Sequence, residues 1–250
     1  MKPSPTCLTL LQVIGHPRHV KKALDAGVDL ICAQAGEGGG HTGDIAASIL
    51  VPTCVDIVKG HTSPLTGKPI YVIGAGAVFD GRSLAANLMW GAQGVWVGTR
   101  FVASEEAGAP AAHKQAVLTA GYDDIIRTII YTGRPLRARR TPYIEDWCVF
   151  YTCTYWAHFY RVFLFFVRDG RESNRQAEIK ELTAKGIIPN DHEMEKHPEK
   201  SLQARTFPMG NVAAVIKEIL PAREIVDNMV SEAAAQLRRG GTLLDAQAKL

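Results

Sequence analysis

The sequence has few cysteines, and their spacing fits neither a disulfide framework nor a metal site. The 250-residue chain holds five, Cys7, Cys32, Cys54, Cys148 and Cys153. Five is an odd number, and no two of them have C-x-x-C spacing or another spacing typical of metal ligands. Because disulfides belong mainly to oxidising compartments, this pattern favours free thiols in a reducing one. We therefore predict a cytoplasmic protein with no metal site.

The sequence also lacks a charge excess of either sign. It has 28 basic and 25 acidic residues, and its formal net charge of +3 is too small to indicate a nucleic-acid or membrane partner. The segment GRPLRARRTP at residues 133–142 concentrates four arginines. Arginines beside glycine and proline fit a solvated loop, or a contact to phosphate or nucleic acid. We favour the loop and predict no nucleic-acid partner.

A small-residue cleavage site is missing after the first apolar run, so we expect no export. The final residues Ala248, Lys249 and Leu250 resemble the Ser-Lys-Leu peroxisomal address, which leaves a peroxisomal location open beside the cytoplasmic one. With 46% hydrophobic and 21% charged residues, the composition is that of an ordinary soluble globular protein. The length suits one sizeable domain or two small ones.

Short apolar runs indicate parallel strands buried on both faces, because they are continuous and do not alternate with polar residues. They lie at residues 8–14, 28–34, 69–76 and 94–99. The stretches between them predict helices at 17–27, at 44–60 with Asp44 as the cap, and at 80–91. The order strand–helix–strand predicts an α/β fold with a parallel sheet. Both an open doubly wound sheet and a (β/α) barrel of TIM type fit this order.

The remaining chain reads as mostly helical. Residues 105–133 predict helix with a glycine break, and residues 211–240 predict one or two helices that end at Gly240. Residues 190–210 show no periodicity and predict a surface connection.

Glycine-rich loops follow three of the predicted strands. They read QAGEGGGHTG (34–43), GAGAVFDG (74–81) and GTRF (98–101). Ligands of parallel α/β folds bind at this end of the strands, where glycines let backbone N–H groups approach an anion. The pattern therefore predicts a phosphate site, or else tight turns that need positive φ. A dinucleotide fingerprint is not favoured, because Phe79 stands where its third glycine should be.

His41 is the one group in its loop that can change charge near neutral pH. A histidine beside a bound anion suits general acid–base catalysis, whereas a lone loop histidine is commonly a surface residue. Its setting in a glycine run after a strand favours a functional role. The flanking Gln34 offers an amide to a heterocycle edge, and Glu37 could orient a neighbour.

Three segments resemble the nitronate monooxygenase family, formerly called 2-nitropropane dioxygenase, whose members are FMN-dependent TIM barrels. These segments are residues 27–43, 72–107 and 209–226, and the likeness extends over 8–147 and 175–240. The resemblance implies oxidation of alkyl nitronates with O2 to a carbonyl compound and nitrite. A related flavin-dependent enoyl reductase and a non-catalytic flavin-binding remnant stay open as alternatives.

The resemblance also implies roles for particular residues. His41 matches the active-site histidine, as the base or the positive partner of the nitronate. The residues implied in FMN binding are Gln34, Gly38, Gly39 and Gly40 near the ring, and Gly74, Ala75, Gly76, Gly98 and Thr99 at the phosphate. Ala35 and Ala77 stand where the family commonly has glycine, and each adds a methyl group near the cofactor.

Only four strands are visible, whereas a TIM barrel needs eight. We therefore expect a truncated, partial barrel at 1–146, an anomalous insertion at 147–174 and a helical region at 175–250. Open sheet edges would favour self-association or pairing with another half. The aromatic run at 148–167 has the length of a membrane span. It also fits an aromatic lid or translated intron, and we favour intron and expect no membrane partner.

Overall fold

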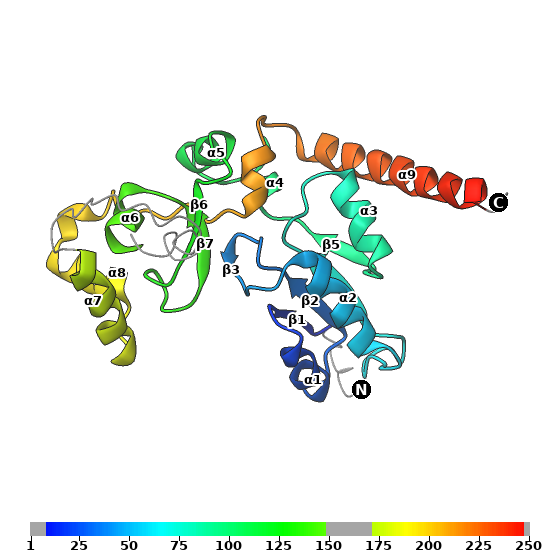
Figure 1. Ribbon diagram of the computed structural model, residues 1–250, viewed down its shortest axis with the longest axis horizontal. Coiled ribbons are helices and arrows are strands. Elements are labelled where there is room, and N and C mark those ends of the chain that lie inside the picture. Colours follow the sequence, from blue (N-terminus) through cyan, green and yellow to red (C-terminus); the bar gives the residue numbers. More distant parts are fainter. Residues whose placement is uncertain (1–8, 149–171, 248–250) are drawn as a thin grey trace, which may run out of the picture.

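The computed structural model describes residues 9–148 and 172–247, and the account below concerns these residues (Figure 1). A parallel sheet with its helices lies at one end of the molecule. A small antiparallel sheet and a group of short helices lie at the other end.

The parallel sheet has four strands in the order β1-β2-β4-β5. Their bounds are Leu11–Ile14, Leu30–Gln34, Tyr71–Ala75 and Gly94–Trp96. All three neighbouring pairs are parallel. The four apolar runs therefore do form parallel strands, each shorter than the run that predicted it.

Helices cover one face of this sheet. They are α1 (Arg18–Asp25), α2 (Ala47–Val58) and α3 (Gly81–Met89). Ile31, Ala33 and Val72 point from the strands into a buried cluster that includes Leu50 and Cys54 of α2. Burial of such side chains stabilises by roughly 1.5–3 kcal/mol each, so this layer is the main core of the parallel unit.

The start of α3 was predictable, whereas the start of α2 was not. The Asp80 carboxylate accepts a hydrogen bond from the backbone N–H of Ser83 at 2.8 Å and forms a capping box. The prediction of Asp44 as the cap of α2 is wrong. Helix α2 begins after Ala46, because Asp44 instead pairs with Arg127. Pro52 lies inside α2.

The structure has a three-stranded antiparallel sheet that the sequence did not predict. It has the order β3-β7-β6, with bounds Gly40–His41, Leu136–Arg139 and Ile125–Thr128. Two predictions are corrected here. Residues 105–133 are helical only in part, at α5 (Ala111–Leu118), and the middle of the arginine segment, Leu136–Arg139, is a strand instead of a solvated loop. Its side chains alternate, with Leu136 and Ala138 buried.

Short helices pack beyond this sheet: α6 (Pro142–Cys148), α7 (Glu172–Ala184), α8 (Pro189–Lys196) and η1 (Pro198–Lys200). The prediction of a mere surface connection over 190–210 is therefore wrong. Glu193 of α8 is buried and pairs with Arg175 at 2.8 Å and Lys200 at 2.6 Å. Burial alone would raise the pKa of Glu193, but these partners hold it below its usual value.

The chain then returns to the parallel sheet through η2 (Asn211–Val215) and ends in the long helix α9 (Ala222–Gln247). The expected helix end at Gly240 is wrong, because α9 continues past it. Helix α9 packs on α3, where a Cβ at Gly81 would lie 2.5 Å from the backbone nitrogen of Ala233. Glycine is therefore required for this close approach.

The aromatic run lies almost entirely outside the described residues, so its origin stays a prediction. Among the helices that the structure describes, none is both long enough and apolar enough to cross a membrane.

Asp29 connects the start of β1 to the loop before β4. Its carboxylate accepts hydrogen bonds from the backbone N–H of Leu10 at 2.7 Å and from the hydroxyl of Ser63. These bonds, the one from Ser63 above all, hold the pKa of Asp29 below its usual value. A carboxyl group with a lowered pKa contributes stability that is complete above its unfolded pKa and is lost as the pH falls through the folded one.

Replacing Asp29 with asparagine is therefore expected to destabilise the fold at pH 7 and to matter less in acid. The difference in free energy of unfolding between wild type and Asp29→Asn should shrink as the pH falls below roughly 4. Urea unfolding at pH 7 and pH 3 measures it. A difference that stays the same at both pH values would contradict the assignment.

Candidate functional site

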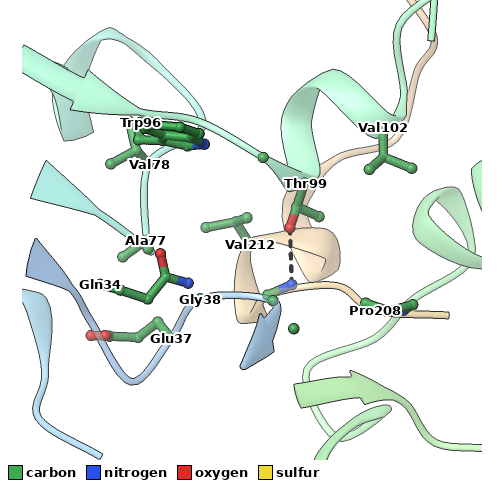
Figure 2. Close-up of a pocket in the computed structure, with 15 residues that line it drawn as sticks. Gln34, Glu37, Gly38, Ala77, Val78, Trp96, Thr99, Val102, Pro208 and Val212 are labelled. Atoms are coloured by element: carbon green, nitrogen blue, oxygen red, sulfur yellow. Dashed lines mark hydrogen bonds between the residues drawn. The ribbon is translucent and has the colours of Figure 1, made fainter. Parts of the chain in front are cut away.

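A pocket of about 250 Å³ opens where β2, β4 and β5 end (Figure 2). The loops after these strands form three of its walls, and the segment before and at the start of η2 forms the fourth. Its lining residues are Gln34, Glu37, Gly38, Gly39, Gly40, Gly76, Ala77, Val78, Trp96, Gly98, Thr99, Val102, Pro208, Gly210 and Val212. The three glycine loops predicted to meet at this end of the sheet do line one pocket.

Glycine is required in the first loop because the chain is crowded there. A Cβ at Gly39 would lie 2.6 Å from the carbonyl carbon of Met209, and one at Gly38 would collide with the Gln34 side chain. Real Cβ atoms do not come so close to backbone. The loop and the segment at Met209 can therefore touch only where side chains are absent.

The second loop turns through the left-handed region. Gly76 has φ of 82°, and a Cβ there would lie 3.0 Å from the backbone nitrogen of Gly38. Ala77 follows with φ of 59°, and in the described part of the chain it is the one non-glycine residue with positive φ. Backbone strain of this kind is common at ligand sites.

The fourth wall is held by hydrogen bonds across the pocket. The backbone N–H of Gly210 donates to the Thr99 hydroxyl at 2.9 Å, drawn as a dashed line in Figure 2. The backbone N–H of Asn211 donates to the Glu37 carbonyl at 2.9 Å. Pro208, Gly210 and Val212 were not among the predicted site residues, although the motif at 209–226 contains two of them, Gly210 and Val212.

Arg137, from the segment predicted as a loop, binds the backbone of the first glycine loop. Its Nε donates to the Gly36 carbonyl at 2.9 Å, and its Nη1 donates to the Asn211 side chain at 3.1 Å. Burial lowers the pKa of Arg137. This guanidinium thus connects two walls of the pocket.

Glu37 has a local structural role. Its two carboxylate oxygens each accept from the backbone N–H of Ala47 at 3.2 Å, at the start of α2. In Figure 2 its side chain points away from the amide of Gln34. The orienting partner of Glu37 is therefore a helix N-terminus.

His41 lies beside the pocket and does not line it. It is exposed on β3, next to Gly40, and its Nε2 lies 2.8 Å from the Thr132 hydroxyl. That hydroxyl lies 3.2 Å from the Arg134 carbonyl and can donate to it. In that arrangement the Nε2 of His41 carries the proton and donates to Thr132.

Two other predicted residues also stand outside the pocket lining. Gly74 faces α3, where a Cβ would collide with the Asn87 side chain, and Ala75 is buried at the end of β4. Glycine at position 74 is therefore explained by its packing against Asn87 of α3. The remaining predicted cofactor residues, from Gln34 to Thr99, line the pocket together.

Replacing Ala77 with glycine is expected to leave the fold as stable or to stabilise it by up to about 1 kcal/mol. Relief of left-handed strain outweighs the greater freedom of glycine in the unfolded chain. Ala35→Gly is the matched control, because Ala35 is fully buried and lacks a positive φ. It should lose roughly 1 kcal/mol. Thermal unfolding compares the two, and equal losses would contradict the strain at Ala77.

A match to a known protein family identifies the family of this chain. The model of the nitronate monooxygenase family matches residues 4–232. The chain belongs to the nitronate monooxygenase family. This confirms the resemblance of the three motifs, and it makes the chain a member of an oxidoreductase family for which a flavin cofactor is implied.

Curated proteins match about half of this chain. A substituted octahydro-indene-carboxyl-CoA dehydrogenase of Mycobacterium tuberculosis is 44% identical over 132 residues, which is 53% of this chain and 35% of that protein. A probable nitronate monooxygenase of Staphylococcus saprophyticus is 33% identical over 149 residues, or 54% of this chain and 39% of that protein. The matched region thus spans little more than a third of these relatives.

Solved structures share the fold. FabK from Thermotoga maritima has a TM-score of 0.68 at 24% identity, and the match covers 94% of this chain and 64% of that one. A nitroalkane oxidase from Streptomyces ansochromogenes has a TM-score of 0.62 at 23% identity, covering 91% and 58%. The similarity confirms an α/β fold in which helices pack on a parallel sheet.

Proposed function

We propose that this chain carries the FMN-binding half of an enzyme that oxidises alkyl nitronates with O2 to a carbonyl compound and nitrite. The observation that carries the proposal is the meeting of three glycine loops in one pocket at the ends of β2, β4 and β5. Ligand sites of parallel α/β folds lie at this end of the strands. Family membership supplies the class of reaction.

The residues present fit part of a flavin. Side chains at Gly39 and Gly76 would collide with backbone, so the pocket is lined there by main chain that a flat or anionic group can approach. Its volume of about 250 Å³ is just below the 300–1,000 Å³ usual for ligand sites. We infer that it would hold one part of the cofactor and that Trp96, an exposed residue of the lining, would contact the rest.

Each wall has a proposed task. Gly76, Gly98 and Thr99 hold the phosphate, while Gly38, Gly39 and Gly40 leave room for the ring. The amide of Gln34 can donate to or accept from the ring edge. Gly74 and Ala75 act indirectly, because they let α3 approach and so set the position of the second loop.

A bound FMN would supply the redox chemistry that links oxidation of the nitronate to reduction of O2. His41 either takes up a proton or, when protonated, faces the anionic nitronate. Thr132 positions the imidazole through the 2.8 Å contact at Nε2, which leaves Nδ1 available to the substrate.

The direct experiment supplies the purified full chain with FMN and propyl-2-nitronate. We expect oxygen consumption with nitrite release, both dependent on FMN. A folded, FMN-binding chain that consumes no oxygen would overturn the proposed reaction.

A second candidate is a flavin-dependent reductase or dehydrogenase of thioester-linked substrates. The 44% identity to a carboxyl-CoA dehydrogenase favours it. Such an enzyme would exchange electrons with a nicotinamide cofactor or another acceptor. NADH or NADPH consumption with an enoyl-CoA, and none of oxygen with a nitronate, would select this candidate.

We further propose that the four-stranded sheet is part of a TIM-type barrel at residues 1–146, with an insertion at 147–174 and a helical region from 175. The buried, free thiols of Cys32 and Cys54 support a reducing, cytoplasmic location. The peroxisomal alternative depends on the last three residues, which lie outside the described ranges.

A further inference from the structure

We propose that Arg127 and Arg137 are positioning residues, which hold the loop of residues 36–44 in the shape that its ligands require. This loop, here called the His41 loop, carries three glycines of the pocket lining as well as His41. The two arginines have different effects, because Arg137 sets the cofactor pocket and Arg127 sets His41. The inference rests on the proposed function, in which both parts of the loop have a task.

The His41 loop is closed at its base. The backbone N–H of Gly36 donates to the Ile45 carbonyl at 2.8 Å. A Cβ at Gly36 would lie 2.9 Å from the carbonyl carbon of Asp44, so the two ends of the loop touch. Groups that bind this base therefore determine where the rest of the loop lies.

The two arginines lie side by side on the antiparallel sheet. Arg127 of β6 and Arg137 of β7 are directly paired in the strand register, and Arg137 is also paired with Gly40 of β3. Residues directly opposite each other in such a pair are on the same face of the sheet. Both guanidinium groups can therefore reach the loop from one face.

The arginines bind opposite ends of the loop. The Nε of Arg137 donates to the Gly36 carbonyl at 2.9 Å, ahead of the pocket glycines. The Nη1 of Arg127 donates to the Gly43 carbonyl at 3.0 Å, and its Nη2 donates to the Asp44 carboxylate at 2.9 Å. Hydrogen bonds from a charged donor are stronger than neutral ones, so these contacts restrain both ends of the loop.

Carboxylates offset the repulsion between the two arginines. Burial lowers the pKa of Arg137, and the nearby charge of Arg127 lowers it further. The charges of Glu37 and Asp44 act in the opposite direction. Both carboxylates belong to the His41 loop, so the loop and the two arginines stabilise each other.

The two arginines differ in what else they contact. Arg137 also donates from Nη1 to the Asn211 side chain at 3.1 Å, and so fixes the distance between the glycine loop and the fourth wall of the pocket. Arg127 binds residues 43 and 44, which follow His41 by two and three positions. Loss of Arg137 should therefore affect the cofactor, and loss of Arg127 should affect the histidine.

The test compares Arg137→Met and Arg127→Met in the full chain, since methionine removes the donors and retains an apolar stem. Arg137→Met should raise the FMN dissociation constant at least about tenfold. Arg127→Met should leave FMN affinity within about twofold and lower kcat for propyl-2-nitronate at least about tenfold. Lysine at either position keeps the charge and loses the planar fork, and should give intermediate losses. Arg223→Met is the control, because the Arg223 side chain is 91% exposed on α9.

Hydrogen exchange separates this inference from the proposed reaction, because it needs neither FMN nor nitronate. The amide of Gly36 should exchange at least about tenfold faster in Arg137→Met. The amide of Thr42, which donates to the Pro135 carbonyl at 3.3 Å, should do so in Arg127→Met. Neither should change in Arg223→Met. These exchange rates together with a wild type that consumes no oxygen would overturn the reaction and retain the positioning role.

Two results would overturn the inference. One is unchanged exchange of both amides in the arginine variants. The other is a parallel loss of FMN affinity and kcat in both variants that follows their melting temperatures, since this would show a general structural role. Circular dichroism checks folding, and the lysine variant replaces a methionine variant that does not fold.

Discussion

His41→Asn is expected to lower turnover of a nitronate by at least about 100-fold while leaving FMN binding intact. A positioned acid or base contributes about 10²–10⁴-fold, and asparagine can neither take up a proton nor carry a positive charge. Because His41 stands beside the pocket and does not line it, the variant should not disturb the flavin. The loss should appear in kcat, since the proposed role of His41 is to act on the substrate during the reaction.

Oxygen uptake with and without the substitution measures this effect, and FMN titration monitors binding. His19→Asn is a suitable control, because His19 is an exposed histidine on α1. It should keep full activity. If His41→Asn were as active as His19→Asn, His41 would have no part in the reaction.

Gly39→Ala is expected to cost about 1–3 kcal/mol of stability and to abolish flavin binding. The added methyl would lie 2.6 Å from the Met209 carbonyl carbon and 2.7 Å from the Gly210 nitrogen, both backbone atoms. Neither side can yield by rotating a side chain. The glycine loop and the fourth wall must therefore separate, and the pocket between them is lost.

Thermal unfolding and FMN titration of the variant measure the two consequences. Gly108→Ala is the control, since a Cβ there meets nothing within 4 Å and its φ is not positive. It should be neutral in both assays. Unchanged flavin affinity in Gly39→Ala would mean that the flavin does not depend on this junction.

The parallel strands could be predicted because their signal is local. Continuous apolar runs, bounded by glycines and separated by helical stretches, reproduce β1, β2, β4 and β5 within a few residues. The Asp80 cap is likewise a local pattern. The sheet that these elements build follows from their order along the chain.

The antiparallel sheet could not be predicted, because its strands are short and their partners are distant. Ile125–Thr128 carries two isoleucines that fit a helix as well as a strand. Strand β7 pairs with Gly40 and His41, almost a hundred residues away. No local pattern specifies that pairing, so the arginines of this segment looked like those of a loop.

In the site too, features with a local sequence pattern were predictable and features that depend on distant residues were not. The loop glycines were predictable from their position after strands, but the fourth wall depends on the Thr99–Gly210 hydrogen bond between residues 111 apart. Gly74 illustrates a different limit. A glycine that makes room for Asn87 and a glycine that faces a ligand look the same in the sequence, because both are glycines at the end of an apolar run.

The most direct test of the flavin site is a titration of the folded full chain with FMN, followed by flavin fluorescence and absorbance. We predict saturable binding of one FMN per chain, lost in Gly39→Ala and kept in Gly108→Ala. A signal that stays linear in FMN, with no saturation in a chain that circular dichroism shows to be folded, would contradict the account.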